Sequence, residues 1–194
     1  MEDPTRCRHL CVDMQRMFAE ETPWNVPWMQ RVREGVAVLA DARPADTVFT
    51  RFVPPANPAE ARGTWQAYYQ KWPMMTRQAL GEEMVDILPE LRALVPPALV
   101  FDKPVYSPWL DGRLHVLLQQ QEVSTLVISG GETDVCIMAA VMGAVDLGYS
   151  IILLKDAICS TSDQTHDASL AVFGTRFSTQ IRISTVEEVL AWWR

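Results

Sequence analysis

The chain has 194 residues, of which 48% are hydrophobic and 21% charged, and its formal net charge at pH 7 is −7. These proportions are typical of a globular protein, and the length predicts a single domain over residues 1–194. The acidic balance argues against a nucleic-acid partner, because phosphate binding needs a basic face. No stretch approaches the roughly eighteen apolar residues of a membrane-spanning helix, so we expect no membrane partner.

The spacing of the cysteines and histidines fits neither a disulfide framework nor a local metal site. The four cysteines form no C-x-x-C pair and the three histidines are scattered; the cysteines are Cys7, Cys11, Cys136 and Cys159. The N-terminal segment opens acidic, without the basic and apolar regions of a signal peptide. We therefore expect reduced thiols, a cytoplasmic location and no zinc site built from neighbouring residues.

Short apolar segments bounded by polar or turn residues predict six β-strands. In chain order they are 8–13, 46–52, 98–103, 124–130, 150–156 and 179–184. Segments with helical periodicity separate or follow them, at 28–43, 109–121, 133–148, 162–177 and 184–194. The last has Ser184 or Thr185 as its cap. Strands that alternate with helices predict a parallel sheet that is buried on both faces.

One connection, residues 53–84, is too long for an ordinary loop. It carries four large aromatic residues, Trp65, Tyr68, Tyr69 and Trp72. Long loops in compact domains are either functional or disordered, and the aromatic content favours a functional role. We expect this segment to be an irregular, aromatic-rich insertion near the site.

Three reactive side chains follow three of the predicted strands. Asp13 ends the first strand, Lys103 ends the third, and Cys136 lies within a helical turn of Gly130 and Gly131 after the fourth. Ligands of open parallel sheets bind beyond the carboxyl ends of the strands, where these residues would converge.

Each of the three also has a purely structural explanation. Asp13 fits a turn former as well as it fits a functional residue, Lys103 fits a solvated strand end, and Cys136 fits a small core residue of a buried helix. Together they gain chemical meaning, because a helix N-terminus and a nearby ammonium lower the pKa of a thiol. On that basis Cys136 should react with iodoacetamide well below pH 8 and faster than the other thiols. Asp13 could take the thiol proton, and the glycine turn could expose amides to an oxyanion.

Three ordered motifs carry a resemblance to the isochorismatase-like cysteine hydrolases, which include nicotinamidases and N-carbamoylsarcosine amidase. They are "VDMQ" followed by Phe18, "DKPVYSPW" with Tyr106, and "GGETDVCI". The match runs from about the first strand to the last helix. It implies a three-layer α/β/α Rossmann-like fold with a six-stranded, mainly parallel sheet, and a homo-oligomer, either a dimer or a tetramer.

The resemblance also implies an active site. Its catalytic triad would be Asp13, Lys103 and Cys136, which would hydrolyse small amides or ureides through a thioacyl-enzyme. The oxyanion hole would use the main-chain amides of Glu132 and Cys136, with a cis peptide before Glu132. The family has small apolar residues where this chain has Gly131 and Glu132.

Two differences between this chain and members of the family narrow the expected reaction. Nicotinamidases carry metal-binding histidines after the second strand, whereas residues 49–65 contain no histidine, so we expect no metal cofactor. Isochorismatases proper cleave a vinyl ether and lack the cysteine, so Cys136 favours C–N hydrolysis. The prediction is a metal-independent cysteine amidohydrolase acting on a small amide or ureido compound. The alternatives are a vinyl-ether hydrolase and a non-catalytic binding protein on the same fold.

Several other side chains are candidates for substrate binding. Arg51 fits a contact with a substrate carboxylate or carbonyl as well as it fits a structural ion pair. Trp65 and Trp109 could line the pocket, although packing is the favoured role for each. We expect Lys155 and His166 to lie at the surface, and the remaining cysteines to be structural.

Overall fold

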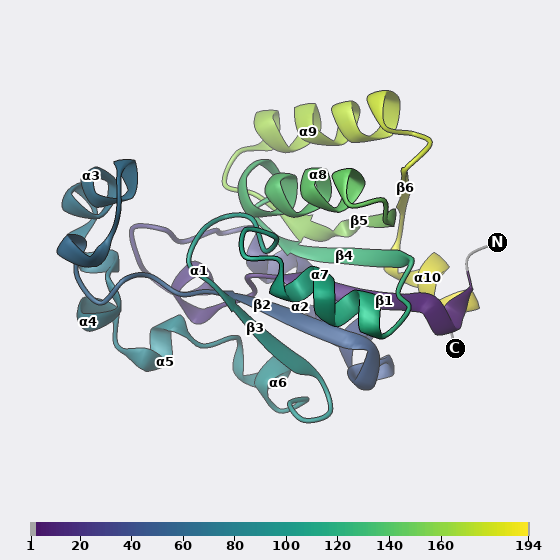
Figure 1. Ribbon diagram of the computed structural model, residues 1–194, viewed down its shortest axis with the longest axis horizontal. Helices are drawn as coiled ribbons and strands as arrows, with labels where there is room; N and C mark the ends of the chain where they lie inside the picture. Colours follow the sequence, from purple (N-terminus) through teal and green to yellow (C-terminus); the bar gives the residue numbers. More distant parts are fainter. Residues whose placement is uncertain (1–2, 194) are drawn as a thin grey trace.

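The computed structural model describes residues 3–193, which form one six-stranded sheet with helices on both faces (Figure 1). Its order is β3-β2-β1-β4-β5-β6, and every neighbouring pair is parallel. The strands are β1 (Cys7–Val12), β2 (Thr47–Phe52), β3 (Leu99–Lys103), β4 (Thr125–Gly131), β5 (Ser150–Cys159) and β6 (Ile181–Ser184). The predicted three-layer α/β/α architecture is confirmed.

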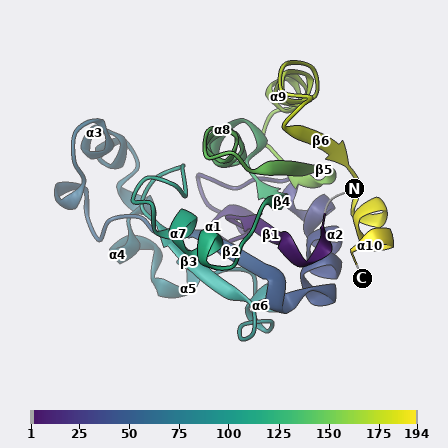
Figure 2. The same ribbon diagram turned by 45° about the vertical axis from the view of Figure 1, so that its right-hand side comes forward.

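Two apolar clusters lie on opposite faces of the sheet, because successive side chains of a strand point to opposite sides. Cys7 and Cys11 of β1 belong to one cluster, and Leu10 and Val12 to the other. Helices α2 (Met29–Ala42), α6 (Pro89–Arg92) and α10 (Val186–Trp192) cover the first face. Helices α7 (Arg113–Gln120), α8 (Met138–Asp146) and α9 (Asp163–Arg176) cover the second (Figure 2).

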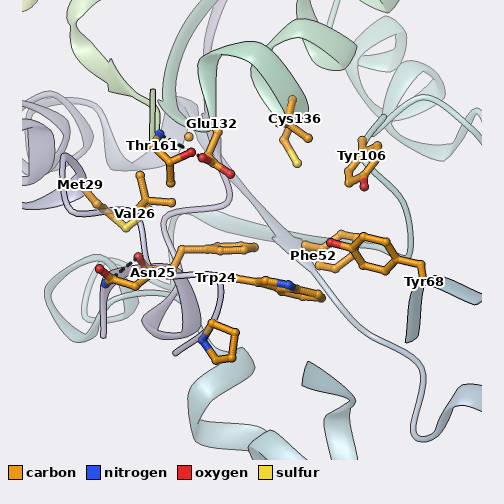
Figure 3. A pocket seen from close by; sticks show the side chains of 14 residues that line it. Trp24, Asn25, Val26, Met29, Phe52, Tyr68, Tyr106, Glu132, Cys136 and Thr161 are labelled. Carbon is orange, nitrogen blue, oxygen red and sulfur yellow. Dashed lines mark hydrogen bonds between the residues drawn. The ribbon is translucent and has the colours of Figure 1, made fainter. Parts of the chain in front are cut away.

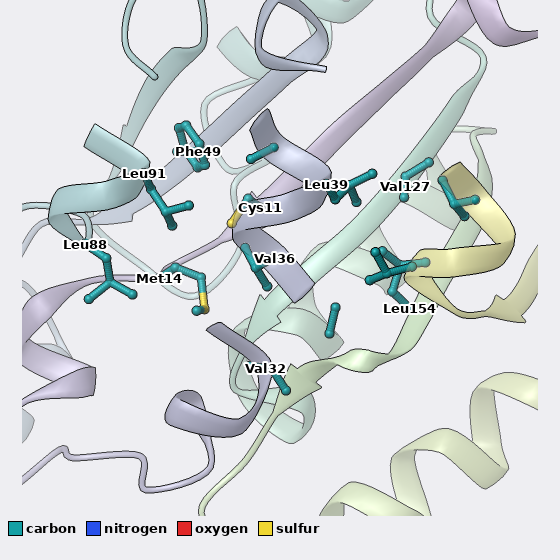
Figure 4. Close-up of a cluster of buried hydrophobic side chains, with 14 of the residues drawn as sticks. Cys11, Met14, Val32, Val36, Leu39, Phe49, Leu88, Leu91, Val127 and Leu154 are labelled. Atoms are coloured by element: carbon teal, nitrogen blue, oxygen red, sulfur yellow. The ribbon is translucent and has the colours of Figure 1, made fainter. Parts of the chain in front are cut away.

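Helix α2 shows how the sequence builds the first of these layers. Its apolar residues recur every three or four positions, so Val32, Val36 and Leu39 all face the sheet and are buried. They pack with Cys11 and Val127 in the cluster drawn in Figure 4.

The ends of the predicted helices differ from the structure in identifiable ways. Helix α7 begins at Arg113 instead of residue 109, because Gly112 adopts a left-handed conformation with φ 74°. The predicted helix 133–148 begins as a π-helical segment, η5 (Thr133–Ile137), and continues as α8. Helix α10 has the predicted cap, which is Thr185 in a capping box with Glu188.

The aromatic-rich segment 53–84 is largely helical, so the prediction of an irregular segment is wrong. It contains η3 (Pro58–Glu60), α3 (Thr64–Lys71), η4 (Pro73–Met75), α4 (Arg77–Leu80) and α5 (Glu82–Val85). Figure 1 shows α3 and α4 at the far left, beyond one end of the sheet. Tyr69 and Met75 form a third apolar cluster with Met17 and Phe52, and this burial stabilises the short helices.

The remaining elements are short. They are η1 (Pro4–Arg6), α1 (Arg16–Ala19) and η2 (Pro44–Asp46). Within residues 3–193, no helix has both the length and the apolar character needed to cross a membrane.

Candidate active site

The three predicted reactive residues meet at the carboxyl edge of the sheet. Strands β1 and β4 are neighbours at the centre, and the chain winds outward from them in opposite directions. This is the topological switch point of the sheet, where open α/β folds bind their ligands.

Asp13 is held by backbone and side-chain bonds to β2. It follows β1 with φ 51°, a left-handed conformation that aspartate tolerates better than most residues. The Thr50 hydroxyl donates to its carboxylate Oδ1 at 2.6 Å, and the Asp13 amide donates to the Thr50 carbonyl at 3.2 Å. Two residues on, the Gln15 side chain accepts a hydrogen bond from the Phe52 amide and donates one to the Phe52 carbonyl. The end of β1 is therefore fixed against the end of β2.

Lys103, the last residue of β3, forms a buried ion pair with Asp13. Its Nζ lies 2.7 Å from Asp13 Oδ2, and the two side chains are 2% and 1% exposed. The ammonium also donates to the carbonyls of Val105 at 3.1 Å and Tyr106 at 2.9 Å. Burial alone would lower the pKa of Lys103, but Asp13 and the Cys136 sulfur outweigh burial and raise that pKa.

The Cys136 thiol lies in η5 and interacts with both members of this pair. Burial and the Asp13 carboxylate raise the pKa of Cys136 well above its ordinary value, and Lys103 opposes them only in part. The expectation of a lowered thiol pKa is therefore wrong for the resting protein. Lys103 is already engaged by Asp13 and two carbonyls, so its charge cannot outweigh the neighbouring carboxylate and the loss of water.

The turn before Cys136 depends on glycine at position 130. Gly130 has φ 111°, and a Cβ atom there would lie 2.0 Å from the Val12 carbonyl oxygen, so no other residue fits. The following Gly131–Glu132 peptide is cis, as the resemblance implies. The amides of Val135 and Ile137 both donate to the Glu132 carbonyl, which closes the π-helical turn around the cysteine.

The thiol opens into a cavity of about 260 Å³ (Figure 3). This volume lies just below the ~300–1,000 Å³ typical of sites for drug-sized ligands, so the cavity suits a smaller molecule. Its lining is largely aromatic and apolar: Phe18, Pro23, Trp24, Asn25, Val26, Met29, Phe52, Tyr68, Tyr106, Gly131, Glu132, Val135, Cys136 and Thr161.

Comparison with known proteins places the chain in a family. The model of the isochorismatase domain matches residues 8–185. The chain belongs to the isochorismatase family. The uncharacterized isochorismatase family protein YaaI of Bacillus subtilis (strain 168) is 27% identical over 128 residues, 66% of this chain and 67% of that protein. Maleamate amidohydrolase of Pseudomonas putida is 28% identical over 145 residues, 72% of this chain and 64% of that enzyme.

Solved structures agree on the fold. A cysteine hydrolase from Pseudomonas syringae pv. phaseolicola 1448A superimposes with a TM-score of 0.84 at 21% identity, covering 98% of this chain and 93% of that one. The N-carbamoylsarcosine amidase of Thermoplasma acidophilum has a TM-score of 0.75 at 16% identity, with coverages of 94% and 97%.

Not every predicted binding residue of this isochorismatase family member lies at the cavity. Phe18 and Tyr106 line it, whereas Arg51 does not. The Arg51 guanidinium forms two hydrogen bonds with Asp102, at 2.7 and 2.8 Å, and a third with Asp86 at 3.2 Å. These carboxylates occupy its donors, so the structural ion pair is the correct alternative.

The two predicted tryptophans also lie outside the lining. The Trp109 indole donates to the Ala140 carbonyl at 2.8 Å, and its ring occupies the space that Gly143 leaves by lacking a Cβ. Trp65 packs behind the wall, with its ring 4.9 Å from that of Tyr106. Both have packing roles, and neither is placed to touch a substrate in this cavity.

His166 is buried, so the expectation of a surface position is wrong. Its Nδ1 lies 2.9 Å from the Thr133 hydroxyl, and its ring lies 5.2 Å from that of Trp28. Thr133 also donates to the Cys159 carbonyl at 3.0 Å. This network ties the turn that carries Cys136 to β5 and α9. Lys155 is exposed, as expected, but lies within β5, which continues to Cys159.

Several residues that line the cavity belong to none of the sequence motifs. Trp24, Asn25 and Met29 come from the connection between α1 and α2 and from the start of α2. Tyr68 comes from α3 and lines the cavity together with Tyr106 (Figure 3). The aromatic content of residues 53–84 was the only signal for Tyr68.

The two acidic residues beside the thiol have different partners. The Ser160 hydroxyl donates to Asp134 at 2.6 Å, which holds that carboxylate outside the cavity lining. Glu132 lines the cavity, and its Oε1 accepts a hydrogen bond from the Thr161 amide at 3.1 Å. Burial raises the pKa of Glu132, although the bonds from Thr161 oppose that effect.

Within residues 3–193, no group of three His, Cys, Asp or Glu side chains is placed to hold a metal ion.

Proposed function

We propose that this isochorismatase family protein is a cysteine amidohydrolase, which cleaves the C–N bond of a small amide or ureido compound. The observation that carries the proposal is that Cys136, which lines an aromatic cavity, lies close enough to the buried Asp13–Lys103 pair to interact electrostatically with both of its members. A thiol, a base and a fixed cation in mutual contact are the groups that nucleophilic acyl transfer requires.

In the first step, Asp13 takes the proton of the neutral Cys136 thiol as the sulfur attacks the substrate carbonyl. The raised pKa of the thiol makes this transfer necessary, because little thiolate exists before substrate binds. Lys103 balances the negative charge, which passes from the carboxylate to the sulfur and then to the carbonyl oxygen. Its three hydrogen bonds hold it in place during this shift.

In the second step, the tetrahedral intermediate collapses to a thioester. The main-chain amides of Glu132 and Cys136 would hold the oxyanion. Protonated Asp13 gives its proton to the departing nitrogen, so ammonia or an amine leaves and the acyl group stays on Cys136. Asp13, again ionised, then takes a proton from water, which attacks the thioester. The acid is released and the proton returns to the sulfur.

Release of ammonia from a panel of small amides and ureides tests the proposal directly. Wild-type protein should release ammonia from at least one compound, and Cys136→Ala should abolish that release, because the acyl acceptor is gone. Cys159→Ala is the matched control. It removes a buried thiol that packs against Gly131. Cys159 itself is not part of the cavity lining, so the variant should keep most of the activity.

The same variants separate the proposal from its alternatives. Undiminished turnover by Cys136→Ala would exclude a thioacyl mechanism. It would favour the alternative of a vinyl-ether hydrolase, in which Asp13 transfers the proton and the cysteine is not needed. We also propose that the reaction needs no metal, because the segment after β2 lacks histidine. Activity should therefore survive dialysis against EDTA.

A further inference from the structure

Glu132 places an acidic group inside the cavity, beside the thiol. Both residues line the same space, and Figure 3 shows them on one wall, with the rings of Trp24 and Phe52 opposite. One carboxylate oxygen, Oε1, accepts from the Thr161 amide, and the other lies on the cavity side. Among the described residues, Thr161 is the one that hydrogen-bonds to this carboxylate.

No basic side chain of the described chain lines the cavity with Glu132. The cation of the site, Lys103, is 2% exposed and directs its ammonium at Asp13 and two backbone carbonyls. Asp13 and Lys103 are paired with each other, so Glu132 is the one acidic side chain of the described residues that lines the cavity, and no basic group of the lining balances it. A substrate carboxylate would enter this space without a partner, which is unfavourable in a site of low dielectric constant.

The opposite wall also favours a cation. Trp24 lies with its ring centroid 6.3 Å from that of Phe18 in a stacked arrangement, and 5.6 Å from that of Tyr68. Trp24, Phe18 and Tyr68 all line the cavity. The faces of such rings attract ammonium groups, and tryptophan does so most strongly.

We infer that Glu132 is a specificity residue, which selects amides that carry a protonated amino group at the end away from the scissile carbonyl and disfavours amides that carry a carboxylate there. This inference rests on the proposed amide hydrolysis for the placement of the carbonyl at Cys136. It separates this chain from the maleamate amidohydrolase relative, since maleamate, the substrate in that enzyme's name, is itself a carboxylate.

Binding to an inactive variant tests the inference without relying on turnover. Calorimetric titration of Cys136→Ala with three probes of matched length compares a cation, a neutral molecule and an anion: β-alaninamide, butyramide and succinamate. Glycinamide and malonamate repeat the comparison at one methylene less. We expect each cationic probe to bind at least about tenfold more tightly than the anionic probe of the same length.

Glu132→Gln in the Cys136→Ala background keeps the shape of the side chain and removes its charge. It should abolish the preference for the cation. Glu34→Gln, which neutralises an exposed glutamate of α2, is the matched control and should keep that preference. The inference is overturned if the anionic probes bind as well as the cationic ones, if no cationic probe binds, or if the preference survives Glu132→Gln.

Turnover by otherwise wild-type protein then distinguishes the two proposals. Should the cationic probes bind preferentially but no amide be hydrolysed, the selectivity would stand and the proposed activity would fail. Should anionic amides be the ones hydrolysed, the activity would stand and the role of Glu132 would be wrong. In the expected case, kcat/KM for the cationic amide falls about tenfold or more in Glu132→Gln and is unchanged in Glu34→Gln.

Discussion

Replacing Lys103 by methionine removes the ammonium from the buried pair and retains much of the side-chain volume. The carboxylate of Asp13 then stays 1% exposed beside Thr50 with no counter-ion. Replacing Asp13 by asparagine makes the complementary change. Asparagine accepts the left-handed backbone and can keep the hydrogen bond from Thr50, so the charge is the main loss.

The size of the effect follows from the geometry. Two unit charges 2.7 Å apart attract each other by about 6 kcal/mol at an effective dielectric constant of ~20, and desolvation of both groups offsets part of this. Breaking such a pair by removing one partner costs about 3–5 kcal/mol, because the other charge stays buried and unpaired. Removing both charges leaves no unpaired ion, so the double variant should be less destabilised than the sum of the single variants by roughly 2–3 kcal/mol.

Urea unfolding followed by tryptophan fluorescence measures these free energies, and the chain has seven tryptophans to report it. With a slope of about 2–3 kcal/mol/M, Lys103→Met should lower the urea midpoint by roughly 1–2.5 M. The reasoning would be refuted if Lys103→Met unfolds within 0.3 M of wild type, taking ~1 kcal/mol as the resolution of the method. Strict additivity in the double variant would refute it too.

Two further predictions concern titratable groups. Burial and Asp13 raise the pKa of Cys136, whereas Lys103 lowers it. Alkylation of Cys136 by iodoacetamide should therefore be slow at pH 7 in wild type and faster in Asp13→Asn. A rate that Asp13→Asn leaves unchanged would contradict the assigned interaction between Asp13 and the thiol. His9 is 0% exposed between Thr47 and Ser129, and burial lowers its pKa from 6.5 to about 3. Between these values the unfolded chain binds a proton that the folded chain does not, so stability should fall as pH falls, by at most ~1.4 kcal/mol per pH unit. His9→Gln should flatten this dependence in urea titrations at pH 4 to 6.5, and an equal slope in both proteins would show that His9 is protonated in the fold.

The fold was largely predictable, because its signals are local. The six strands are continuous apolar segments, and α2 and α10 have clear periodicity or caps, so their existence follows from short stretches of sequence. Parallel strands bring their carboxyl ends to one edge, which is why the prediction of a parallel sheet was enough to place Asp13, Lys103 and Cys136 at that edge.

The lining of the cavity was less predictable, because it depends on contacts between distant segments. Arg51 lies near the end of β2 and Trp109 lies after β3, close to the edge that carries the site. Arg51 nevertheless pairs with Asp102, and Trp109 fills the space beside Gly143. Trp24 belongs to no motif, and it reaches the cavity because the connection between α1 and α2 forms part of the cavity wall.

The electrostatics of the thiol could not be derived from residue spacing either. The position of Cys136 near the start of a helix suggested a lowered pKa for its thiol, but burial and the carboxylate of Asp13 raise that pKa instead. Whether the pKa of Cys136 rises or falls depends on which groups the Lys103 ammonium already binds. Its hydrogen bonds to the carbonyls of Val105 and Tyr106 can be seen only in the structure.

The mass of the protein during turnover tests the central claim most directly. Rapid acid quenching of wild-type protein with a hydrolysed amide, followed by intact-mass and peptide mass spectrometry, should reveal the acyl group of that substrate on Cys136. The adduct should be absent in Cys136→Ala and present in Cys159→Ala. Turnover without any adduct on Cys136, or an adduct on another residue, would contradict the proposed role of Cys136 as the nucleophile.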